Sequence, residues 1–206
     1  MALRFSSTTS SASCFSRALL VFLALVLFAA PALADVCVWR DPERTMQRIF
    51  PAARDYKTIT VKFTPENARA IEKQLGFSIE EPAQGGEFNF YDIIGAVGGK
   101  PRKIGTVIAL AGKGEYGVIE VVIGVDDAGK ILGAYIQRSR ERATKALESP
   151  GFLDQFNGKT SASSFDVGSA IKPAAGAEAA SRTVAVVIRK MLVFNQVLNK
   201  GDGMNV

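Results

Sequence analysis

The stretch Gly158–Lys190 has residue types that could bind an anion. A polar loop leads to Gly176 and Ala177, which directly precede a long segment with apolar residues at helical spacing. Small residues at a helix start leave backbone N–H groups accessible, and the helix dipole favours a negative charge at the same place. Ser181 and Arg182 add a hydroxyl and a positive charge. The same pattern is also that of an ordinary small-residue helix start, so these residues alone leave both interpretations open.

Two glycine-rich motifs resemble phosphate-binding loops but lack their context. Gly112–Gly117 matches G-x-G-x-x-G, which binds dinucleotides where a strand is followed by a helix. Here the motif lies between two predicted strands, so we interpret it as a hairpin turn. Gly98-Gly99-Lys100 resembles the end of a P-loop, but Pro101 stands where Ser or Thr is required. We predict no nucleotide site at either motif.

Histidine is absent from the chain, which excludes several kinds of active site. No Ser-His-Asp or Cys-His system, histidine zinc site or histidine-ligated haem can form. The carboxylates show no spacing that indicates acid–base catalysis, and we expect most of them to be solvated. They are Glu120, Asp126, Asp127, Glu141, Glu148, Asp154 and Asp166. We predict no catalytic side chain and no metal site, and redox chemistry would need an organic cofactor. Whether the protein is an enzyme stays open.

Residues 1–34 have the three parts of a secretion signal. Arg4 and Arg17 are followed by the apolar run Ala18–Ala30, and Ala32-Leu33-Ala34 presents small residues before Asp35. The pattern predicts an exported, periplasmic protein.

Two alternatives to cleavage are a membrane anchor and a lipoprotein. The apolar stretch is near the short limit for a spanning helix and Pro31 interrupts it. Lipidation would use Cys37, but Asp35-Val36 fits poorly before a lipid-accepting cysteine. After cleavage Cys37 would be alone, because Cys14 leaves with the signal, so no intramolecular disulfide is expected.

Periodicity predicts an α+β fold, with one domain after the signal peptide. Strands are expected at Lys57–Phe63, Phe88–Val97, Lys103–Ala111, Gly117–Val125 and Lys130–Gln137. The short turns between the later strands favour an antiparallel β-meander packed with helices. Helices are expected from Asp41 to about Phe50, from Pro65 to Leu75, over Ser139–Leu147, over Pro150–Phe156, and from Ala177–Ala179 to about Asn199.

The order of features in the last half of the chain supports a family resemblance. Lys103–Val107, the hairpin Gly117–Ile136, Gly151–Lys159 and Val167–Ala185 follow one another in this order. In these features the chain resembles the FMN-binding domain family, which includes the flavin-carrying subunits of the sodium-pumping NADH:quinone reductase and related exported electron-transfer proteins. The resemblance implies an FMN-binding-like domain over 103–200, with 35–102 as an N-terminal helix–strand–helix extension and loop.

The family's flavin-attachment signature is Asp-x-x-Ser/Thr-Gly-Ala-Thr/Ser-x-Ser/Thr, and this chain keeps only part of it. Gly176 and Ala177 match, whereas the chain departs at Lys172, Ala175, Glu178 and Ala180. Ala180 stands at the acceptor position and has no oxygen, so the usual phosphoester cannot form there. Ser181 is adjacent, but on a helix it points about 100° away.

The resemblance therefore implies a protein of electron transfer, or an accessory to an envelope redox system, with FMN bound non-covalently. Its phosphate is expected near Gly176, Ala177, Ser181 and Arg182, with help from Lys159. A redox partner protein in the cell envelope and a membrane surface are the expected partners. Nucleic acid is not, because clustered arginines with interleaved aromatics are absent. The alternative is a cofactor-less binding or structural envelope protein that keeps the fold.

Overall fold

The computed structural model describes residues 43–79 and 86–199. The chain divides into two compact units, Met1–Asp35 and Val36–Val206, and all described residues belong to the second. The predicted secretion signal, Cys37 and the predicted helix start at Asp41 lie outside the described residues.

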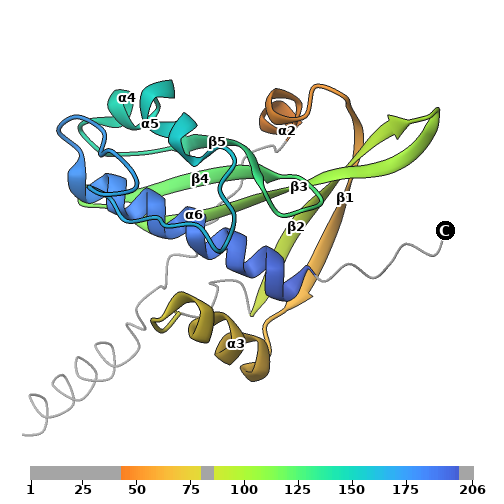
Figure 1. Ribbon diagram of the computed structural model, residues 1–206, viewed down its shortest axis with the longest axis horizontal. Coiled ribbons are helices and arrows are strands. Elements are labelled where there is room, and N and C mark those ends of the chain that lie inside the picture. The colour runs from red at the N-terminus through yellow and green to blue at the C-terminus, as the bar shows by residue number, and fades with distance from the viewer. Residues whose placement is uncertain (1–42, 80–85, 200–206) are drawn as a thin grey trace, which may run out of the picture. The chain divides into compact units, whose positions relative to one another are not determined.

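Five strands form one antiparallel sheet in chain order, which confirms the predicted meander (Figure 1). They are β1 (Ala53–Lys62), β2 (Glu87–Val97), β3 (Lys100–Lys113), β4 (Val118–Val125) and β5 (Ile131–Arg138). Strand β3 begins three residues before the predicted start because Pro101 is accommodated there. Pro101 pairs with β2 at a position beyond the end of β4. Because no described strand lies on its other side there, the missing proline N–H removes no hydrogen bond to β4.

Helix α3 (Pro65–Leu75) begins and ends where its capping residues predict. It begins after Thr64, whose hydroxyl accepts from the Asn67 N–H, and ends at left-handed Gly76. Helix α2 (Glu43–Ile49) precedes β1, and α6 (Glu178–Leu198) closes the described chain. Helix α5 (Pro150–Leu153) continues as a 3-10 turn over Asp154–Phe156.

The predicted helix over Ser139–Leu147 is wrong in its first half, because only α4 (Thr144–Leu147) is helical. The Ser139 hydroxyl accepts from the Glu141 N–H at 3.0 Å and from the Thr144 hydroxyl at 3.1 Å. Short polar side chains that bond nearby backbone groups compete with helix formation. The resulting turn directs the Glu141 side chain toward the β3–β4 hairpin, where it accepts a hydrogen bond.

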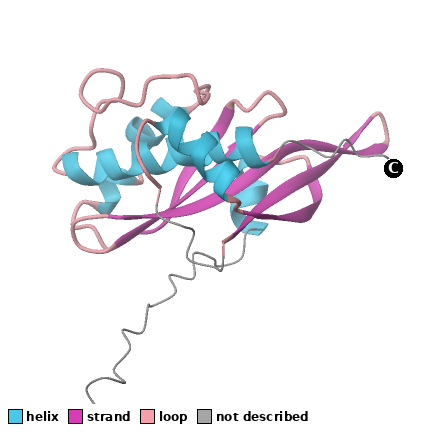
Figure 2. Cartoon of the chain, turned by 90° about the horizontal axis from the view of Figure 1, so that it is seen from below, coloured by secondary structure: helices cyan, strands magenta, loops and turns pink. Residues whose placement is uncertain are grey.

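Helices pack on both faces of the sheet, and α6 lies lengthwise along one of them (Figure 2). Helix α6 runs antiparallel to β3, since its last turn lies near Thr106 and its second turn near Lys113. On the opposite face, Met46 of α2 and the adjoining Phe50 pack with Ile93 of β2. Within the described residues no helix combines the length and apolar character needed to span a membrane.

Candidate functional site

The first turn of α6 is an uncapped helix start. Ala177 precedes it with φ −140° and provides no side-chain cap. The N–H groups of Glu178, Ala179 and Ala180 come too early in the helix to have an intrahelical acceptor. Gly176 enters the turn with φ 68°, a left-handed conformation that favours glycine. Three backbone donors and the positive end of the helix dipole therefore coincide at this turn.

Ser181 holds this turn in place from beneath. Its side chain is fully buried, and its hydroxyl oxygen accepts a hydrogen bond of 3.0 Å from the Ala174 N–H. The Ala174 carbonyl in turn accepts from the Ala177 N–H. The Ser181 oxygen is thus directed into the protein, and its role in a ligand site would be to position the turn.

The Gln155 side chain stabilises the backbone at Lys172, which precedes this turn in the chain. Its oxygen accepts from the Lys172 N–H at 2.8 Å, and its amide nitrogen donates to the Lys172 carbonyl at 3.1 Å. The backbone before α6 is therefore held from the 3-10 turn on one side and from Ser181 on the other. The Lys172 side chain remains exposed.

The β3–β4 turn reaches the same level of α6, which follows from the antiparallel course of β3. The Thr183 hydroxyl donates to the Lys113 carbonyl at 3.2 Å. Gly112 lies beneath α6, where a Cβ would lie 2.5 Å from a Val187 methyl group. The G-x-G-x-x-G motif is a strand-to-strand turn, so its interpretation as a hairpin is confirmed.

Glu141 ties the segment after β5 to this turn. Its carboxylate accepts from the Tyr116 N–H at 3.0 Å, and only 7% of the residue is exposed. It also packs directly on Gly114, where any Cβ would overlap the carboxylate. Glu120 is buried too, so these two carboxylates do not belong to the solvated surface that their sequence pattern suggested.

An exposed aromatic ring projects from the turn that Glu141 holds. Tyr116 is 42% exposed, and the Arg142 guanidinium carbon lies 4.5 Å from its ring centroid. The cation and the ring face form a cation–π pair. The Thr183–Lys113 hydrogen bond places this hairpin at the same end of the sheet as the start of α6. We call Tyr116, Arg142, Gly176, Ala177 and Arg182, with the N–H groups of residues 178–180, the α6-start site. It combines backbone donors, two guanidinium groups and a flat apolar surface, which is chemistry that suits a phosphorylated aromatic ligand.

The charges around the α6-start site are not all positive. Arg182 and Glu178 are both exposed, and they lie one helical turn apart on the same face. An anion at the helix start would therefore meet one cation and one carboxylate from α6 itself. The second cation of the site, Arg142, lies over the Tyr116 ring on the β3–β4 turn.

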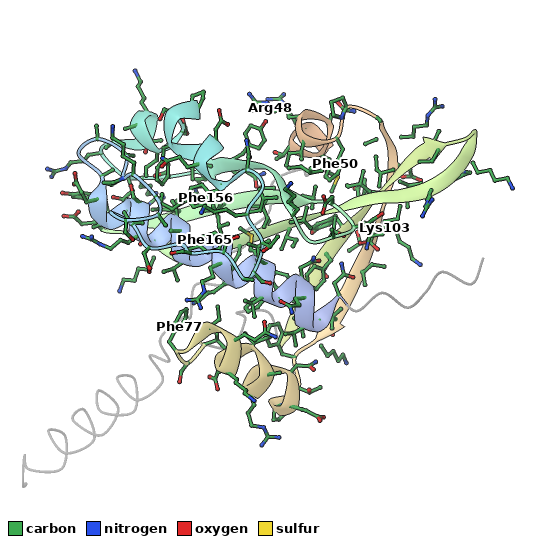
Figure 3. The ribbon with its side chains drawn as sticks, in the orientation of Figure 1. Arg48, Phe50, Phe77, Lys103, Phe156 and Phe165 are labelled. Carbon is green, nitrogen blue, oxygen red and sulfur yellow. The ribbon has the colours of Figure 1, made fainter. Side chains whose placement is uncertain are left out.

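Lys159, the remaining predicted phosphate ligand, lies elsewhere. Its ammonium donates to the Ser164 carbonyl at 3.0 Å and lies 5.7 Å from the centroid of Phe165, a residue labelled in Figure 3. Nearby Ser161 donates to Gln196 in the last turns of α6, about 22 Å along the helix from Ser181. The loop after Lys159 runs back along α6, so the structure brings four predicted residues together and separates the fifth.

Sequence reasoning missed Tyr116 and Arg142. The sequence did hold a clue to this region, because the glycine-rich turn between two predicted strands carries an aromatic residue, Tyr116. The sequence does not show that this turn and the start of α6, more than 60 positions later, lie at the same end of β3.

A pocket of about 230 Å³ lies away from these residues, beside α2 and β1. It is lined by Met46, Gln47, Ala53, Arg54, Asp55, Tyr56 and Ile93. The Asp55 carboxylate already accepts from the Tyr56 N–H, and none of the predicted ligand residues takes part. Next to it, burial and the neighbouring Tyr56 raise the pKa of Tyr91 above its usual value. In the described part of the chain no three metal-ligating side chains gather.

Comparison with known proteins gives a similarity at the level of the fold. No family model matches the chain, and no curated protein matches it. Among solved structures, the chain is similar to a subunit of the Na⁺-translocating NADH-quinone reductase from Parabacteroides distasonis ATCC 8503. The identity is 15%, the TM-score is 0.46, and the match covers 80% of this chain and 86% of that one. A similarity of this size carries no statement about function.

Proposed function

We propose that this protein binds FMN non-covalently at the α6-start site and serves in electron transfer, or as an accessory to a redox system of the cell envelope. The observation that carries the proposal is the uncapped start of α6 at the same end of β3 as a turn with an exposed aromatic ring. The helix start would receive the phosphate through the backbone N–H groups of residues 178–180. Arg182 and Arg142 would add charge, and Tyr116 would stack on the isoalloxazine ring.

Bound FMN would supply the redox chemistry, and this chain's residues would hold and orient it. Ser181 and Gln155 would keep the phosphate-binding turn in shape, since both bond to its backbone. Glu141 would keep the hairpin that carries Tyr116 against the helix start. Ala180 has no oxygen, so the flavin would leave when the protein unfolds.

The proposal is tested on the full chain expressed in a flavin-replete host. We expect flavin absorbance in the purified protein and release of that flavin on denaturation. Calorimetry should show FMN binding at least about tenfold tighter than riboflavin, since only FMN carries the phosphate. Arg182→Glu should weaken FMN binding by about tenfold, as expected for a partly exposed charge contact worth about 1.4 kcal/mol. Arg69→Glu, on an exposed position of α3, is the matched control and should leave the affinity unchanged.

A cofactor-less binding or structural protein is the second candidate. It is favoured by Glu178, whose exposed carboxylate in the first turn of α6 would repel a phosphate. This candidate predicts a colourless protein that takes up neither FMN nor riboflavin. Stoichiometric FMN in the purified protein would exclude it, and no binding of added FMN would exclude the first.

A further inference from the structure

The β2–β3 hairpin extends beyond the rest of the sheet as a two-stranded arm. Pairing of β1 with β2 ends at Ala53 and Gly95, and pairing of β3 with β4 ends at Thr106 and Val125. We call residues 96–104 the arm. Its outer part, residues 96–101, pairs only within the hairpin, and residues 102–104 have no described strand on the β4 side (Figure 1). At about 3.3 Å per residue, β3 continues for about 20 Å past the end of β4.

The arm carries unbalanced positive charge. No acidic residue occurs in the sequence between Asp92 and Glu115. Lys103 pairs with Asp92 at 2.7 Å at the base of the arm, where Figure 3 labels it. Lys100 and Arg102 further out are exposed, and among the described residues neither has an ion-pair partner.

The tip of the arm is apolar and exposed. Val97 is 48% exposed, and its neighbours Ala96 and Pro101 are exposed as well. The turn between them is Gly98-Gly99, with both φ values positive and no atom near either Cβ position. An apolar tip flanked by two long cations can enter a lipid headgroup layer while the charges remain at its surface.

A strand partner would not suit this arm. Pro101 has no N–H to donate, and Lys100 and Arg102 place charges along the same edge, which are the features that oppose edge-to-edge pairing. A stable interface with a folded acidic protein would bury about 800 Å² on each partner, and the tip of two strands offers a smaller area than that.

We infer that the arm docks the protein on an anionic phospholipid surface, with Val97 entering the headgroup layer and Lys100 and Arg102 contacting lipid phosphates. The α6-start site lies at the opposite end of β3, thirteen residues or about 43 Å from Lys100. Docking through the arm would leave that site facing away from the lipid. The inference does not depend on FMN, so either proposal can fail without the other.

The test is co-sedimentation of the full chain with vesicles. The probes are vesicles of phosphatidylcholine with about 30% phosphatidylglycerol and vesicles of phosphatidylcholine alone. We expect binding to the anionic vesicles only, weakened by salt. Lys100→Glu with Arg102→Glu should reduce binding at least about 25-fold, taking about fivefold for each cation lost. Arg69→Glu with Lys73→Glu on α3 changes the net charge equally and should change binding by less than about threefold.

Insertion of the tip is tested by fluorescence. Val97→Trp should show a blue shift of its emission with anionic vesicles, after subtraction of the wild-type signal. Val186→Trp, at a similarly exposed valine of α6, should show none. Equal loss in the arm and α3 double variants would overturn the inference, as would equal binding to both vesicle types. Absence of vesicle binding, with arm-dependent binding to soluble polyglutamate, would assign the arm to an acidic protein partner instead.

Discussion

The two ends of strand β3 use glycine for opposite purposes. At the α6-start end, side chains approach the glycines closely: Val187 lies over Gly112 and the Glu141 carboxylate over Gly114. At the arm end, Gly98 and Gly99 have no heavy atom within 4 Å of a Cβ position. One turn is built to bring three segments into contact, and the other is built to leave its tip free. The close packing at one end suits the ligand site that we propose there, and the open tip at the other end suits the proposed lipid contact.

The largest expected effect is at the junction between the two regions. Gly105→Ala would place a Cβ 2.5 Å from the Phe50 ring and from the Val125 carbonyl, at φ 157°. We expect a loss of about 3 kcal/mol in the free energy of unfolding, because the packed core cannot yield to backbone and ring together. Urea denaturation measures it. Gly99→Ala at the free tip is the control and should cost about 1 kcal/mol, from its left-handed conformation alone.

Removing the Glu141 carboxylate should destabilise the α6-start end of β3 and leave the arm unchanged. We expect Glu141→Ala to lower the free energy of unfolding by about 2 kcal/mol, since a buried charge-assisted hydrogen bond to the Tyr116 N–H is lost. FMN affinity should fall as well, while vesicle binding stays unchanged. Glu141→Gln keeps an acceptor and should recover about half of the loss. If the alanine variant were as stable as wild type, Glu141 would not hold the hairpin.

Ser181→Ala probes the turn beneath the helix start. The substitution leaves the Ala174 N–H without its acceptor in a buried position, so we expect a loss of about 1.5 kcal/mol. Thr183→Ala removes a hydroxyl that bonds at the surface and should cost about 0.5 kcal/mol. Thermal denaturation of both variants compares the two costs. Equal values would mean that burial of Ser181 has no special role.

The smallest effect sharpens the proposal for the helix start. Ala177→Ser would place a hydroxyl beside the free N–H groups of the first turn, as a helix cap does. We expect a gain of about 0.5 kcal/mol in stability together with weaker FMN binding, because the hydroxyl and the phosphate compete for the same donors. Calorimetry of FMN binding alongside thermal denaturation would show the opposite signs. A variant with unchanged FMN affinity would move the phosphate away from the helix start.

The limits of prediction from sequence lie where distant segments meet. The apolar pattern predicts a strand start at Lys103, whereas β3 begins at Lys100, because Pro101 lies beyond the edge of β4 and no ladder bond to a second neighbour is lost there. The local pattern predicts a helix over Ser139–Leu147, but the Ser139 hydroxyl accepts from the Glu141 N–H and the Glu141 carboxylate bonds the distant Tyr116 N–H. The family resemblance groups Lys159 with the phosphate site, whereas the path of the following loop places it near the other end of α6.

The sequence by itself determined the meander, helix α3 with its Thr64 and Gly76 caps, and the long helix after Gly176. These depend on apolar periodicity and capping, which act between residues close in the chain. Only the tertiary structure decided that the hairpin with Tyr116 lies beside the start of α6 and that the arm extends past β4. Both depend on the register between strands and on the direction of α6 along the sheet, which arise from packing between residues far apart in the chain.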